Sequence, residues 1–226
     1  MKKATKFVIF ALSVILLVGA TVVGTLAWLT AKDEVVNTFT VGKVSITLDE
    51  QDVDEYGNPV RSLNRVKENT YRLIPGNTYI KDPTVTVKAG SEESYIRMLV
   101  TINKYTVLKD VFGDGFLPEN YVNGTWDKTV WKCVGAAVDN IANTVTYEFR
   151  YHTTVSTVSQ TADEVLPPLF TEFTLPGTVT SAHLEELNEG ENLKISVVAH
   201  AIQTHGFDSE DAAWTAFDVQ MSANNQ

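Results

Sequence analysis

The sequence predicts an all-β protein: a jelly-roll-type β-sandwich with two short helices and long loops, preceded by a signal-peptide helix that is cleaved. Val and Thr supply 29 and 27 of the 226 residues, which is a β-rich composition. About eight short segments alternate apolar and polar residues between turn signals, as sandwich strands do. Apolar residues make up 44% of the chain, enough for the core of one domain.

Charge and cysteine content narrow the function. The net charge of −10 argues against a nucleic-acid partner, because such a partner requires a basic face. Cys133 is the only cysteine, so the chain can form neither an internal disulfide nor a multi-cysteine zinc site. The fold must therefore be held together without disulfides.

Residues 1–27 have the pattern of a signal peptide. An apolar run over residues 7–23 is long enough to cross a bilayer, and small residues follow it up to Ala27. Three lysines precede the run: Lys2, Lys3 and Lys6. Cleavage after Ala27 would release a secreted chain that begins at Trp28 and touches the membrane only before cleavage. An uncleaved N-terminal anchor is the alternative.

Residues 28–37 are expected to form an extended arm ahead of a single β-sandwich domain over residues 38–226. The arm is mostly polar and has no strong fold signal of its own, yet a well-patterned strand follows it. Its apolar side chains Leu29, Val35 and Val36 are candidates to fill pockets on a neighbouring subunit. A disordered tail is the alternative.

The most informative strand covers residues 95–106. Its alternate residues are apolar and predict a core face: Ile96, Met98, Val100 and Ile102. Tyr95, Arg97 and Leu99 point the other way, so this strand is expected to be partly covered on both faces. Further strands are expected at residues 37–48 (changing phase at Gly42), 84–88, 144–151, 170–175 and 193–202.

Two short helices are expected, over residues 180–187 and 208–217. Thr180 or Ser181 would cap the first helix, and Asp208 the second. Two aromatic residues share the face with which the second helix would dock on a sheet: Trp214 and Phe217.

Turn chemistry marks the connections between these elements. Residues 49–58 have the composition of an acidic loop, and Pro75-Gly76 within residues 74–77 predicts a type II turn. Residues 107–132 are expected to form a long irregular loop with at most one helical turn.

Metal chemistry finds weak support. A zincin helix needs H-E-x-x-H, but the segment from His183 has a displaced Glu and places Leu187 where the second His should be. His200 and His205 are five residues apart, which places them on opposite faces of a strand. We therefore predict no catalytic residues, no metal site and no cofactor. A calcium site within residues 52–57 stays open, although this D-x-D-x-x-G segment lacks two of the ligands of an EF-hand.

The sequence contains no motif for nucleophilic catalysis either. There is no G-x-S-x-G motif and no histidine beside Cys133, which is expected to be an isolated buried thiol.

Two blocks of the sequence resemble the TasA and camelysin family of Gram-positive bacteria, which is exported through a SipW-type signal peptidase. The first block joins the junction at residues 24–30 to residues 37–44; the second joins residues 201–207 to Ala212-Ala213-Trp214 and Phe217. The turn at residues 73–77 also fits.

The resemblance implies a secreted jelly-roll subunit that self-assembles into extracellular biofilm-matrix fibres. In such fibres the N-terminus of one subunit completes the sheet of the next, by donor-strand exchange. Some relatives are labelled metalloendopeptidases, so a camelysin-like cell-surface metalloendopeptidase is the alternative. A third possibility is a monomeric binding module that uses the aromatic loop at residues 112–131.

Overall fold

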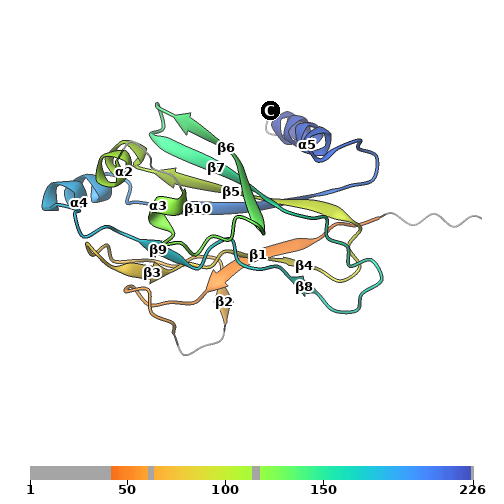
Figure 1. The fold of residues 1–226 in the computed structure, drawn as a ribbon, viewed down its shortest axis with the longest axis horizontal. Helices are drawn as coiled ribbons and strands as arrows, with labels where there is room; N and C mark the ends of the chain where they lie inside the picture. Colours follow the sequence, from red (N-terminus) through yellow and green to blue (C-terminus); the bar gives the residue numbers. More distant parts are fainter. Residues whose placement is uncertain (1–41, 61–63, 114–117, 225–226) are drawn as a thin grey trace, which may run out of the picture. The chain divides into compact units, whose positions relative to one another are not determined.

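The structure is a computed structural model that describes residues 42–60, 64–113 and 118–224 (Figure 1). The predicted signal peptide, its cleavage site and the arm lie outside the described residues. The described residues all belong to one compact unit, which begins at Gly42.

Three antiparallel sheets make up most of this unit. The first has the order β2-β1-β4-β8, the second β10-β5-β7-β6, and the third pairs β3 with β9. The strands of the first sheet are β1 (Ile46–Gln51), β2 (Arg65–Val66), β4 (Thr84–Val87) and β8 (Glu164–Val165). Those of the second are β5 (Ser94–Asn103), β6 (Trp131–Asp139), β7 (Thr144–Tyr151) and β10 (Ile195–Gln203). Those of the third are β3 (Thr78–Ile80) and β9 (Glu172–Thr174).

Three helices lie in connections between strands: α2 (Tyr105–Phe112), α3 (Pro118–Tyr121) and α4 (Ser181–Asn188). A further helix, α5 (Glu210–Asn224), follows the last strand. The all-β prediction is thus confirmed at the level of antiparallel sheets with few helices.

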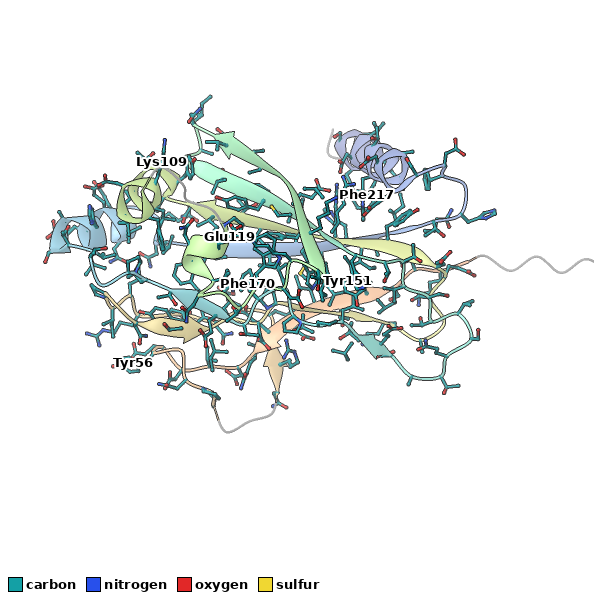
Figure 2. All side chains as sticks on the ribbon, viewed as in Figure 1. Tyr56, Lys109, Glu119, Tyr151, Phe170 and Phe217 are labelled. Atoms are coloured by element: carbon teal, nitrogen blue, oxygen red, sulfur yellow. The ribbon has the colours of Figure 1, made fainter. Side chains whose placement is uncertain are left out.

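The core lies between the inner faces of the first two sheets. The predicted inner row of β5 is completely buried, as are Val85 and Val87 of β4 and Phe149 of β7. Phe170, labelled in Figure 2, packs into the same cluster. The alternation in the sequence therefore identifies the core correctly, because a strand places every second side chain on one face.

Several local predictions are confirmed. Pro75 and Gly76 form the expected turn, in which Asn77 N donates to Ile74 O at 3.1 Å and Gly76 has φ 78°. Thr180 caps α4 by accepting a hydrogen bond from His183 N.

The first predicted strand has the wrong boundaries. Within the described residues it begins at Ile46, not near the predicted bend at Gly42, and runs to Gln51, into the predicted acidic loop. Its last two residues pair with β2, a partner that comes from further along the chain. Long-range pairing therefore overrides the polar character of this segment.

The long loop expected at residues 107–132 contains α2 and α3, and its last two residues begin β6. Leu108 of α2 is completely buried and packs this helix against the core. At the start of the helix, Asn143 Oδ1 accepts a hydrogen bond from Thr106 N at 2.9 Å. The chain thus has more helix than predicted, and the preceding strand ends at Asn103 instead of residue 106, because burial of residues such as Leu108 outweighs the irregular local pattern.

The last helix is longer than predicted and has a different cap. Asp208 is expected to cap this helix, but Ser209 does so: its Oγ accepts a hydrogen bond from Ala212 N at 3.2 Å. Trp214 is buried as predicted, and Phe217 is half-buried.

Replacing Gly57 by Ala should destabilise the domain more than replacing Gly90 by Ala. Both glycines have positive φ, 83° and 77°, which costs a side-chain residue about 1–2 kcal/mol. A Cβ at Gly57 would also lie 2.7 Å from Tyr79 Cα, whereas at Gly90 it meets nothing within 4 Å. Urea unfolding of both variants measures the difference, and equal losses would show that the contact with Tyr79 does not constrain the turn.

Candidate assembly groove

A groove with a volume of about 880 Å³ lies where the edges of the two main sheets come together. One wall comes from β1 and the segment at residues 67–73, and the other from β10 with the residues just before it. β10 lies beside β1 in the fold (Figure 1). The apolar residues that line the groove include Leu48, Tyr71, Leu193, Ile195, Val197 and Ala199.

The apolar residues of β1 and β10 that line the groove form a seam at the edge of the core, and they are less buried than their partners on the neighbouring strands. Ile195, Val197 and Ala199 stand opposite Ile102, Val100 and Met98 of β5 and share their inward direction. The β5 residues are completely buried, but their β10 partners are only half-buried. Likewise, Ile46 and Leu48 of β1 are half-buried while Val87 and Val85 opposite them on β4 have no exposure. The core is therefore incompletely covered along this seam.

Backbone pairing is also incomplete on both walls. Among the described residues β10 pairs only with β5, so its other edge faces the groove without a strand partner. β1 pairs with β2 only through Glu50 and Gln51, which leaves residues 46–49 paired on the β4 side alone. An extended segment could thus gain main-chain hydrogen bonds and cover apolar side chains at the same place.

The β1 wall contains a buried ionic cluster. Lys81 Nζ lies 2.7 Å from Glu50 Oε2, and both residues are 7% exposed. The other carboxylate oxygen, Oε1, accepts from Asn69 Nδ2 at 2.9 Å. Burying a charge is costly unless it is paired and hydrogen-bonded, and here both oxygens of one carboxylate are used.

The opposite face of the β10-β5-β7-β6 sheet is covered by α5 (Figure 1). Arg97 of β5, only 2% exposed, places its guanidinium 4.4 Å from the centre of the Trp214 ring and binds the Asp218 carboxylate with two nitrogens. The strand is thus partly covered on its second face as well, as predicted, and Arg97 attaches the helix to the sheet.

His200 belongs to this helix contact. Its Nδ1 lies 3.3 Å from Arg97 Nε, and its ring lies 4.7 Å from that of Phe217, which is labelled below α5 in Figure 2. Burial lowers the pKa of His200 below its ordinary value of 6.5, and the charge of Arg97 lowers it further. The nearby carboxylates Asp218 and Glu148 act in the opposite direction with smaller effect.

The other histidines and acids singled out in the sequence are engaged in local structure. His183 caps its own helix through Nδ1 and lies 3.1 Å from Asp110 through Nε2. Asp54 accepts hydrogen bonds from Tyr56 N and Asn58 N, and the bond from Asn58 holds the pKa of this carboxyl below its usual value. Within residues 42–60, 64–113 and 118–224, no three His, Cys, Asp or Glu side chains gather in a way that could hold a metal ion.

The described aromatic residues of the 112–131 segment pack mainly inward. Trp131 and Tyr121 are completely buried, while Trp126 donates through Nε1 to Trp131 O at 2.7 Å and packs edge-on against Phe149. Cys133 is half-buried, not fully buried as expected, and burial raises the pKa of its thiol. These side chains contribute to the core and its margin.

The residues predicted to carry processing and assembly, Ala27, Trp28, Leu29, Val35 and Val36, lie outside the described part of the chain. Sequence patterns do not predict the groove, because its two walls are separated by more than 110 residues in sequence. The only local sequence feature at the groove is the polar end of β1 around Glu50, and the acidic composition of that segment predicts a loop instead of a strand.

No protein-family model matches the chain, and no curated protein or solved structure matches it. The resemblance to the TasA and camelysin family therefore stays a prediction from the sequence. Among the helices that the structure describes, none combines the length and the apolar character needed to cross a bilayer.

Acidification should loosen the contact between α5 and the sheet through His200. Because the folded-state pKa of His200 is lowered, its contribution to stability is present above about pH 6.5 and is lost as the pH falls. His200→Asn should therefore reduce the loss of melting temperature between about pH 7.5 and about pH 5.5. The exposed His205 provides the matched control, since His205→Asn should keep the wild-type dependence. Identical pH dependence in wild type and His200→Asn would contradict the assignment.

Proposed function

We propose that this protein is a secreted structural subunit that self-assembles into extracellular fibres of a biofilm matrix by N-terminal donor-strand exchange. The observation that carries the proposal is the unfilled seam: inward-facing residues of β10 are half-exposed, while their partners on β5 are completely buried. A strand supplied by another copy would cover them. Neither an enzyme nor a nucleic-acid-binding role draws comparable support from the described residues.

The proposed occupant of the groove is the arm at residues 28–37 of a neighbouring subunit. An extended arm gains affinity from main-chain hydrogen bonds, and its apolar residues Leu29, Val35 and Val36 supply side chains for the lining. Such a contact joins the front of one subunit to the groove of the next. Because it is head-to-tail and does not close on itself, it produces filaments.

The remaining parts of the proposal come from the sequence. A jelly-roll connection of the strands is the fold we propose within the observed antiparallel architecture. Export through a SipW-type signal peptidase would remove residues 1–27, so the membrane is a partner only before cleavage.

Secreted protein should begin at Trp28. The small residues up to Ala27 fit the positions that a signal peptidase recognises. N-terminal sequencing or intact-mass measurement of the protein from culture medium identifies the first residue. Protein found only in membranes with Lys2 retained would show that the segment is an anchor.

Val197→Asp should abolish filaments, whereas Val138→Asp on β6 should preserve them. Val197 faces the seam and lines the groove, whereas Val138 is 44% exposed and is not among the groove's lining residues. A carboxylate at position 197 would have to be desolvated by the incoming strand. Electron microscopy measures filaments, and circular dichroism checks that both variants are folded.

Deleting residues 28–36 should also abolish filaments and leave a folded, monomeric protein. If the deletion prevents assembly but Val197→Asp does not, the arm binds elsewhere. If the truncated protein still forms normal filaments, donor-strand exchange through this arm is wrong.

A further inference from the structure

We propose that Lys81 and Asn69 form an intramolecular isopeptide bond, with Glu50 as the proton-transferring residue. The three side chains form one connected cluster: the carboxylate of Glu50 holds the Lys81 amine on Oε2 at 2.7 Å and the Asn69 amide on Oε1 at 2.9 Å. This covalent modification does not depend on fibre assembly.

The cluster contains each group that this acyl transfer requires. Lys81 supplies the nucleophilic nitrogen, Asn69 the carboxamide, and Glu50 an acid–base group in contact with both. A fourth group completes the arrangement: Val53 N donates to Asn69 Oδ1 at 3.1 Å, where negative charge develops when the carbonyl is attacked.

The surroundings favour the reaction. Lys81 and Glu50 are each 7% exposed, and Tyr71 is half-buried beside them with its hydroxyl donating to Ile80 O. Because little water reaches this site, the Lys81 amine contacts the Glu50 carboxylate and not solvent. Asn69 is additionally fixed by donating to Gln51 O at 2.8 Å, which holds its amide on the same Glu50 carboxylate that binds the Lys81 amine.

The step balances without an external reagent. Glu50 takes one proton from the Lys81 ammonium, and the freed lone pair of Nζ forms a bond to Asn69 Cγ. Glu50 returns that proton to Nδ2, the Cγ–Nδ2 bond breaks, and ammonia leaves. The ammonia takes the second proton from Nζ, so the products are the amide, the Glu50 carboxylate and one ammonium ion. No atom changes oxidation state.

The bond would join the segment before β3 to the residue after it and close residues 69–81 into a ring. This chain has one cysteine and cannot form an internal disulfide, so an amide cross-link would be its only covalent constraint of this kind.

Mass spectrometry of the purified full chain tests the proposal. The wild type should be lighter than its sequence by one ammonia, and its peptide map should contain one linked pair carrying Lys81 and Asn69. Glu50→Gln and Lys81→Arg should each have full mass. Lys67→Arg and Glu68→Gln, at exposed neighbouring positions, are the matched controls and should keep the link.

Asn69→Asp gives a second, chemically distinct signature. An aspartate at this position loses water instead of ammonia when it forms the same amide, so the deficit should change accordingly. Wild-type protein with separate, unmodified Lys81 and Asn69 peptides would overturn the proposal. So would an ammonia deficit that maps to Asn123-Gly124, a sequence able to cyclise on its own, and not to the linked pair.

Discussion

The burial of the inner faces of β4, β5 and β7 against one another is the constraint on which the rest of this structure depends. The residues that make this contact are almost wholly excluded from water, and removing apolar area from water is the dominant favourable contribution to folding. The contact ends at the seam between β1 and β10, where equally apolar side chains remain half-exposed. The groove is thus the margin of the core, and its apolar lining continues the alternation that builds the interior.

Sequence patterns predict those features whose cause is local. The row from Ile96 to Ile102 is explained by the two-residue period of a strand, and the turn at Pro75-Gly76 by the fixed φ of proline and the freedom of glycine. The cap at Thr180 is equally local, since its hydroxyl binds an amide three residues away. In each case the interacting groups are close enough in sequence for the chain to specify them without tertiary context.

The features that sequence patterns do not predict depend on partners distant in sequence. β6 carries small, mostly exposed residues and exists because it pairs with β7. Residues 105–106 are predicted as the end of a strand and residues 107–112 as part of an irregular loop, but together they form α2, which buries Leu108. Glu50, Asn69 and Lys81 lie in segments with loop and turn composition, and only the pairing of β1 with β2 and β4 brings them together. Of the two parts of the proposed assembly contact, the sequence therefore indicates only the arm at residues 28–37 and not the groove, and the arm stays a prediction.

The cluster at Glu50 bears on the proposed assembly because it keeps one wall of the groove rigid. An incoming strand loses conformational freedom when it binds, and its net affinity is greatest when the receiving walls are already ordered. The β10 wall is held by its full pairing with β5, and from the other face by the contacts of Arg97 and His200 with α5. The β1 wall has less pairing, and Glu50 compensates by connecting it to Asn69 and Lys81. A covalent bond between those two residues would keep this wall in place whether the groove is empty or filled, so that the wall would not have to rearrange when a strand binds.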